Sequence, residues 1–304
     1  MRRALIPIVT LLVLAVAPAS ANALVVGITD QKPEIFYDER YRELGLTDSR
    51  LVVPWDWNKH RWQREELDNW FDAAERAGVD NVLVAFERSR VNRDKTPTKA
   101  QYMKGFRKFR DRYPQVREFA TWNEPNLHHQ PVAKKVDLVA RFYRAIKRDC
   151  RRCTILASEL IDTPNMRSWT KRFQREIGGP PEIWGIHNYR DTNRRETDQT
   201  RTLLRTSKRS KVWITETGGI VGREKGARAG DFPQTPNNAA KAIRFLFQDL
   251  APMSRRIQRV YVYHWSAGKE KKWDSALIDA KGKARPAYDA FVEELEAMGI
   301  GSFK

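Results

Sequence analysis

Residues 81–122 contain one complete strand–helix–strand pattern. The apolar run "NVLVAF" (81–86) precedes the amphipathic segment "KAQYMKGFRKFRDRYP" (99–114), and a second apolar run, "REFATW" (117–122), follows it. A nearly continuous apolar run is typical of a strand buried on both faces of a parallel sheet. Because parallel strands need a long crossover between them, usually a helix, this stretch predicts a parallel βαβ unit.

The same pattern recurs along the chain, with amphipathic helical segments between the apolar runs. The other strand candidates are "LVVGIT" (24–29), "LVVPWDW" (51–57), "TILASEL" (154–160), "IWGIHNY" (183–189), "KVWITET" (211–217) and "RVYVYHW" (259–265). Eight βα units favour an α/β fold built as a single (β/α)8 TIM barrel. A doubly wound sheet is the alternative, but it usually carries a glycine-rich turn after its first strand, which "GITDQKPE" (27–34) lacks.

The amino terminus reads as a targeting segment. Arg2 and Arg3 precede the apolar run 4–18, and "ASANA" (19–23) offers small residues for cleavage after Ala23. Residues 1–23 are therefore predicted to be a secretory signal, and residues 24–304 a secreted domain. A membrane anchor is the alternative, but the run is shorter than the roughly 20 residues of a span and contains two prolines. No membrane attachment is expected after cleavage.

The chain is strongly basic, with a formal net charge of +18. This charge would suit an anionic polymer of the cell envelope. A well-solvated basic surface is the favoured interpretation, because the lysines and arginines are scattered over the predicted helices. No zinc-finger or RNA-binding signature occurs, so nucleic acid is not expected as a partner. We expect a monomer.

Two cysteines, Cys150 and Cys153, are the only ones in the chain. Two thiols alone cannot complete a structural zinc site. In an exported protein, a local disulfide is favoured. His128 and His129 lack a third ligand at metal spacing, so no metal is expected.

Polar and aromatic residues end nearly every predicted strand, where a (β/α)8 barrel carries its chemistry. Two of them, Glu124 and Glu216, end the fourth and seventh strands and should face each other across the barrel. Paired carboxylates are what glycoside hydrolysis requires. One must stay protonated and the other ionised, so different surroundings should separate their pKa values. A separation of about 5.5 Å would imply retention of configuration. The other strand-end residues are Asp30, Gln31, Trp55, Asp56, Trp57, Glu87, Arg88, Asn123, Glu159, His187, Tyr189, His264 and Trp265.

An ordered set of motifs resembles the retaining glycoside hydrolases of clan A. The set comprises "WNEP" (122–125), "HNY" (187–189), "ETGG" (216–219) and the strand-eight Trp265. The sequence looks most like compact secreted glycosyl hydrolases and, more distantly, like families 39 and 5. The resemblance implies a cofactor-independent glycosidase that cleaves a β-linked oligo- or polysaccharide by double displacement. Glu124 would be the acid/base and Glu216 the nucleophile.

The resemblance also implies roles for the surrounding residues. Asn123 would bond the sugar 2-hydroxyl, and Tyr189 or His187 would orient the nucleophile. Stacking platforms for sugar rings would come from tryptophans. The substrate-binding candidates are thus Asn123, His187, Tyr189, Trp265, Trp55, Asp56 and Trp122, with Trp57 as a further platform.

The sequence differs from the clan pattern in the position of one arginine. The clan usually has an arginine near the end of strand two, supporting the nucleophile. Here Trp55 and Asp56 stand at that end and Arg50 at the start of the predicted strand, so Arg88 is the candidate substitute.

Two other classes of function stay open. A carbohydrate-binding barrel without activity could keep the tryptophans, but would not need both glutamates. A charge-driven polyanion binder would bind with a steep salt dependence. "GREKGARAGDFPQ" (222–234) is predicted to be a rim loop and a candidate lid.

Overall fold

The computed structural model describes residues 24–223, 232–268 and 273–301. The predicted signal segment and most of the candidate lid lie outside these ranges. Among the described residues, no helix combines the length and the apolar character needed to cross a membrane.

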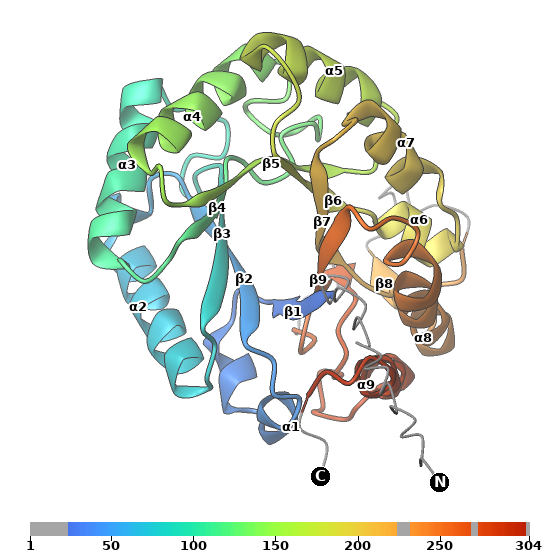
Figure 1. The fold of residues 1–304 in the computed structure, drawn as a ribbon. Helices are drawn as coiled ribbons and strands as arrows, with labels where there is room; N and C mark the ends of the chain where they lie inside the picture. Colours follow the sequence, from blue (N-terminus) through green and yellow to red (C-terminus); the bar gives the residue numbers. More distant parts are fainter. Residues whose placement is uncertain (1–23, 224–231, 269–272, 302–304) are drawn as a thin grey trace, which may run out of the picture.

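The central element is a closed barrel of parallel strands in sequential order (Figure 1). The last barrel strand, β9, pairs with β1 and closes the ring. This arrangement confirms the (β/α)8 prediction. The barrel strands are β1 Val25–Thr29, β2 Asp48–Pro54, β3 Asn81–Glu87, β4 Glu118–Ala120, β5 Thr154–Ile161, β6 Ile183–His187, β7 Lys211–Thr217 and β9 Ile257–Tyr263.

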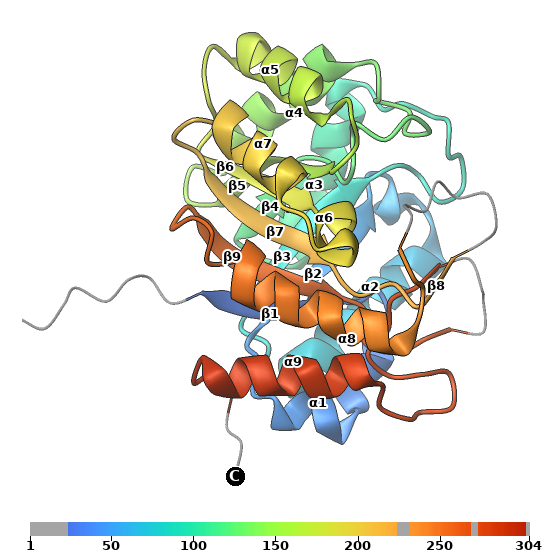
Figure 2. The same cartoon turned by 90° about the vertical axis from the view of Figure 1, so that its right-hand side faces the viewer.

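Helices surround the barrel, as Figure 2 shows from the side, and bury their apolar faces against it. In α2, the predicted face of Leu67, Trp70, Phe71 and Ala74 is buried. A capping box fixes the start of α3, because Thr98 and Gln101 satisfy each other's backbone N–H groups. The helices are α1 Glu39–Glu43, α2 Arg61–Arg76, α3 Lys99–Arg112, α4 Val136–Asp149, α5 Met166–Ile177, α6 Tyr189–Arg194, α7 Asp198–Thr206, α8 Pro236–Phe245 and α9 Pro286–Ala297.

Shorter elements complete the described chain. Two 3-10 turns precede α1 and α2, a π-helical turn follows α8, and a two-stranded ribbon joins two loops above the barrel. These elements are η1 Pro33–Tyr37, η2 Trp57–Lys59, η3 Leu246–Leu250, β8 Gly222–Arg223 and β10 Trp273–Asp274.

Four predicted strand boundaries were wrong, and each error moves site residues. Strand four ends at Ala120, so Trp122 and Glu124 lie beyond it. Strand two runs over Asp48–Pro54 instead of 51–57, which places Arg50 inside it. Strand six ends at His187, and Tyr189 begins α6. Strand eight ends at Tyr263, so Trp265 lies beyond it.

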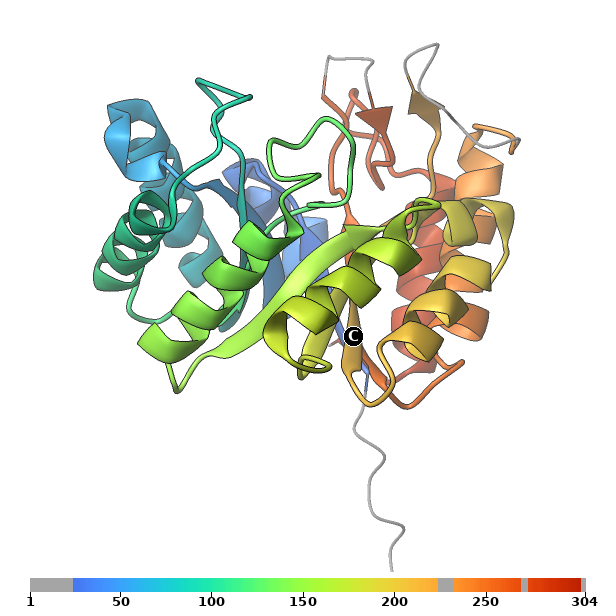
Figure 3. The same ribbon diagram turned by 90° about the horizontal axis from the view of Figure 1, so that it is seen from above.

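The barrel interior is divided into three layers along its axis. At the amino ends of the strands, Arg259 bonds Glu118 at 2.7 and 2.8 Å and Asp48 at 2.9 Å. A buried apolar cluster fills the middle: Val52, Leu83, Ala85, Ala120, Leu156, Ile183, Trp213 and Tyr261. Polar side chains, among them Arg50 and Glu159, occupy the layer above it, at the carboxyl ends of the strands. The longer loops gather at this end of the barrel (Figure 3).

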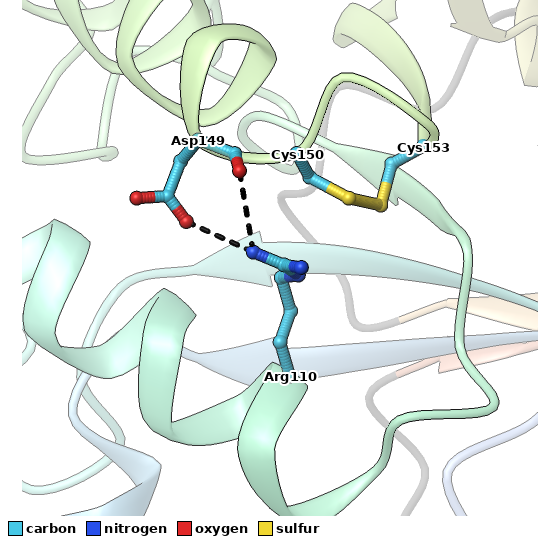
Figure 4. Close-up of a disulfide and its surroundings, with 4 residues drawn as sticks. All are labelled: Arg110, Asp149, Cys150 and Cys153. Atoms are coloured by element: carbon cyan, nitrogen blue, oxygen red, sulfur yellow. Dashed lines mark hydrogen bonds and ion pairs between the residues drawn. A yellow bond between two sulfur atoms is a disulfide. The ribbon is translucent and has the colours of Figure 1, made fainter.

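The two cysteines form the predicted disulfide immediately after α4 (Figure 4). The Cys150 and Cys153 Cα atoms lie 5.3 Å apart. Next to the disulfide, Arg110 of α3 donates to the Asp149 carboxylate at 2.9 Å and ties the end of α4 to its neighbour. The disulfide therefore links residues at the end of α4, which the ion pair of Arg110 and Asp149 already joins to α3.

Candidate active site

Arg50 lies at the centre of the upper polar layer and is fully buried. Its guanidinium holds Glu159 through two hydrogen bonds of 2.8 and 2.6 Å. It also donates to Glu216 at 2.9 Å, to Asn123 at 2.8 Å and to Thr29 at 3.0 Å. A planar fork that binds carboxylates bidentately is the geometry in which arginine is strongest. Arg50 therefore fixes four side chains, which come from β1, β5, β7 and the segment that follows β4.

Arg50 is the arginine that supports the candidate nucleophile, Glu216. The suggestion of Arg88 was wrong, because its side chain donates at 3.3 Å to the backbone oxygen of His129. The sequence prediction missed Arg50 because it began strand two three residues too late.

Irregularities in two strands turn Glu159 and Glu216 into the barrel. Side chains alternate along a strand, so residues three apart should face opposite sides. Leu156 and Glu159 nevertheless both point inward, and so do Trp213 and Glu216, because the register of β5 and β7 shifts between them. Such bulges re-aim side chains. Gly185 leaves room for one of them, since a Cβ there would lie 2.7 Å from Glu159 Cγ.

Glu124 is positioned by an unusual backbone conformation. Its φ angle is +48°, in the left-handed region that a residue with a Cβ seldom adopts. Its N–H donates to the Glu159 oxygen at 2.9 Å, which extends the β4–β5 pairing past the end of β4. Its carboxylate lies 2.9 Å from His187 Nδ1. Backbone strain of this kind concentrates at functional sites.

The two candidate catalytic carboxylates lie close together. Donor atoms of Glu124, His187 and Glu216 all lie within 4.8 Å of one another. The Tyr189 hydroxyl donates to the Glu216 oxygen that Arg50 leaves free, at 3.0 Å. Of the two residues predicted to orient the nucleophile, Tyr189 therefore contacts Glu216, whereas His187 contacts Glu124.

The start of α6, which carries Tyr189, is capped by a buried acid. Asp162 accepts from the backbone N–H groups of Arg190 and Asp191 at 2.7 and 3.2 Å. Burial and, to a smaller degree, the negative charge of Asp191 raise the pKa of Asp162 to about 7. Its charge therefore changes near neutral pH, one helical turn from the site.

The proton balance between Glu124 and His187 differs from the prediction. Burial alone would raise the pKa of Glu124, but the His187 hydrogen bond and the charges of His187 and Arg50 outweigh it, so the pKa lies below its usual value. Burial opposes the charged form of His187, yet Glu216 and the Glu124 hydrogen bond hold the pKa of His187 above its usual value. The pair therefore differs from the expectation that the acid/base carboxyl stays protonated, because both shifts favour the proton on His187.

This cluster could also supply ligands to a metal ion, because Glu124, His187 and Glu216 bring three donor atoms together. Arg50 stands against it, since the guanidinium contacts Glu216 directly and already places a positive charge where a cation would bind.

The prediction that tryptophan side chains form stacking platforms for sugar rings was wrong. Trp55, Trp57, Trp122 and Trp265 are at most 2% exposed, so no sugar ring can lie on them. Three of the four indole N–H groups donate to protein acceptors: Trp57 Nε1 to Gly105 O, Trp122 Nε1 to Gln130 and Trp265 Nε1 to Asp38. These indoles pack in the shell between strands and helices.

Asp56 does not reach the site either. It is buried at the start of the 3-10 turn Trp57–Lys59, and its Oδ1 atom has no hydrogen-bond partner among the described residues. The chain turns outward after Pro54, and this turn carries both Trp55 and Asp56 away from the barrel axis.

Two aromatic rings that the sequence prediction missed lie nearer the carboxylates. Tyr263 ends β9 on the inward-facing side, and burial together with the negative charges of Glu216 and Asp30 raises its pKa. Trp273 packs edge-on against Tyr189, with ring centroids 4.8 Å apart. Counting forward in steps of two from the inward-facing Arg259 and Tyr261 could have identified Tyr263. Trp273 lies in a loop without periodicity, so no pattern indicated it.

Comparisons with known proteins found similar folds among solved structures of glycoside hydrolases. Neither family models nor curated protein sequences match the chain. A family 5 glycoside hydrolase (GH5_18) from Streptomyces cattleya, solved with GlcNAc, is 15% identical, with a TM-score of 0.63 over 93% of this chain and 82% of that chain. Xylanase 10B from Thermotoga maritima is 12% identical, with a TM-score of 0.61 over 91% and 96%. An endo-1,4-beta-xylanase from Caldicellulosiruptor owensensis is 14% identical, with a TM-score of 0.62 over 89% and 97%.

These similarities show that the fold is the barrel of the glycoside hydrolases that the sequence motifs resemble. The residues in the upper polar layer must indicate the chemistry.

Proposed function

We propose that the protein is a secreted retaining glycoside hydrolase that acts on a β-linked glycan. The carrying observation is the pair of carboxylates, Glu124 and Glu216, with oxygen atoms no more than 4.8 Å apart. Retaining enzymes hold their carboxyl groups about 5–5.5 Å apart, whereas inverting enzymes need about 6.5–9.5 Å to admit a water molecule. The GH10 xylanases among the structural neighbours support a β-linked substrate, and the disulfide together with the predicted signal supports export.

Glu216 suits the role of nucleophile because Arg50 and Tyr189 hold its two oxygens from different sides. One oxygen attacks the anomeric carbon as the glycosidic C–O bond breaks, and a glycosyl ester forms on Glu216. The bond from Arg50 to Asn123 fixes the amide oxygen. The amide nitrogen of Asn123 is then oriented to donate to the sugar 2-hydroxyl.

Glu124 suits the role of acid/base. The proton that the pair shares moves from His187 Nδ1 to Glu124, at 2.9 Å, as Glu124 delivers a proton to the departing oxygen. In the second half-reaction, Glu124 removes a proton from water, which attacks the anomeric carbon and releases Glu216. Tyr263 and Trp273 offer apolar ring faces at the entrance, where the buried tryptophans cannot.

Hydrolysis of plant, fungal and bacterial wall polysaccharides and of aryl β-glycosides tests the proposal. On any substrate that is cleaved, Glu216→Gln should lower kcat by at least about 10³-fold. Glu118→Gln is the matched control, because the same change on β4 affects the opposite end of the barrel, and it should retain turnover. Azide should rescue Glu124→Ala on substrates with good leaving groups.

The anomeric configuration of the first product, followed by NMR, tests the stereochemistry. A product of inverted configuration would overturn the double-displacement mechanism. Near-normal turnover by Glu216→Gln would overturn the assignment of the nucleophile.

A further inference from the structure

A groove lies on the outside of the barrel between α5 and α7, which Figures 1 and 2 both show side by side. Gln174 of α5 donates to the Thr206 oxygen at the end of α7, at 3.1 Å, and joins the two helices. The groove has a volume of about 630 Å³. Residues 178–180 and Lys208, which follow the two helices, close it near the amino ends of the strands. It is thus separate from Glu124 and Glu216 at the opposite end.

The side chains that line this groove carry charges of one sign. Five exposed cations line it, and no acidic residue does; they are Arg167, Lys171, Arg175, Arg205 and Lys208. Within the described ranges of the chain, none of the five forms an ion pair. The adjacent helices differ, because Arg107 and Arg110 of α3 share Asp149, and Arg141 of α4 pairs with Asp137.

The spacing of the cations on α5 opposes helix stability. Arg167, Lys171 and Arg175 follow one another at intervals of four, so their like charges face each other along one stripe. The helix dipole favours a cation at Arg175, in the last turn, but disfavours one at Arg167, in the first turn. The helix alone therefore does not account for the stripe, whereas an anion bound along it would relieve the repulsion.

The groove lining discriminates between classes of anion. Among the described residues that line it, no aromatic side chain offers a platform for nucleic-acid bases, and no large apolar side chain could enter a bilayer. Gln174, Thr202 and Thr206 add amide and hydroxyl groups that can bond sugar hydroxyls. We propose that this groove is a second carbohydrate site, which binds an anionic polysaccharide with carboxylate groups recurring along its chain. The site needs no catalysis, so it stands independently of the function proposed above.

Titration calorimetry with polygalacturonate of defined length, at about 50 mM salt where surface charges are weakly screened, tests this site. The parent for the experiment is Glu216→Gln, so that no hydrolysis of the probe can interfere. The triple change Arg167→Gln, Lys171→Gln and Arg205→Gln should weaken binding by about tenfold or more, as expected for the loss of three surface ion pairs. A neutral glucan of equal length should not bind the groove.

The matched control removes three positive charges from another exposed surface, through Lys104→Gln, Lys108→Gln and Arg117→Gln. This variant should stay within about threefold of the parent affinity, because long-range charge alone changes little at this distance. Equal losses in both triple variants would overturn the site, and so would the absence of polygalacturonate binding by the parent. Tighter binding of a single-stranded oligonucleotide of equal charge would assign the groove to nucleic acid and overturn the polysaccharide.

Discussion

The largest effect of a single substitution should come from Arg50→Met. The substitution keeps an unbranched side chain of similar length but removes every hydrogen bond of the guanidinium. Glu159, which is fully buried, then loses both of its bonds to Arg50, and Glu216 loses one. Two carboxylates would then share an enclosed layer in which the remaining buried cation, His187, already contacts Glu124.

The expected loss in free energy of unfolding is about 3–5 kcal/mol near neutral pH, the range found when one partner of a buried ion pair is removed. The loss should depend on pH. Burial without a partner favours the protonated acid, so the folded variant binds protons more tightly than the unfolded chain. Its stability is therefore greatest in acid and falls as the pH rises, which widens the gap to the parent between about pH 5 and pH 8.

Urea unfolding followed by the fluorescence of the ten tryptophans measures this difference. Arg141→Met is the matched control, because Arg141 and Asp137 of α4 form an ion pair whose side chains are 51% and 40% exposed. It should cost about 0.5 kcal/mol or less. A loss below about 1 kcal/mol in Arg50→Met, or a loss that shrinks as the pH rises, would refute the reasoning from a buried charge.

Three further changes have expected outcomes. His187→Gln removes the group that holds the shared proton and whose pKa lies above its usual value, and it leaves that proton to the Glu124 carboxyl group alone. The alkaline limb of the pH profile of kcat/KM should therefore move to lower pH, and a shift to higher pH would contradict the shared proton. The folded-state pKa of Asp162, about 7, exceeds its ordinary value of 3.8, so the parent loses stability as the pH rises through 7. Asp162→Asn, which can still accept at the start of α6, should therefore raise Tm at pH 8 more than at pH 5, and a lower Tm at pH 8 would argue against a buried charge. Replacing Cys150 and Cys153 by serine should cost about 2 kcal/mol or less in urea unfolding, because the closed loop is short; a loss above about 4 kcal/mol would show that the bridge does more than close a loop.

The architecture was predictable because the chain repeats one physical pattern. Apolar runs such as "NVLVAF" alternate with amphipathic helices such as α3, and both patterns can be recognised in a short stretch of sequence. Glu124 and Glu216 could be selected for the same reason, since the end of a parallel strand is visible as the end of an apolar run.

The details of the site depend on features that local sequence does not record. Arg50 sits before the apolar residues of β2, so a search for apolar runs placed it at the edge of the strand. Trp55, Trp122 and Trp265 flank the strand ends, but residue type does not show whether an indole faces the axis or the helices. Trp273 meets Tyr189 only because the chain returns over the barrel after β9.

The bulges in β5 and β7 each hold one residue more than the neighbouring strand. Each shift in register lets a glutamate face the axis three positions after an inward-facing apolar residue. In β7, Ile214 lies opposite Ile186 and Glu216 opposite His187, so Thr215 is the additional residue. Deleting Thr215 would restore regular alternation and would leave Glu216 opposite His187, facing the axis. Pairing with β6 therefore sets the level of this carboxylate, and a lineage carrying this barrel could lose the codon of Thr215 and keep the two carboxylates together.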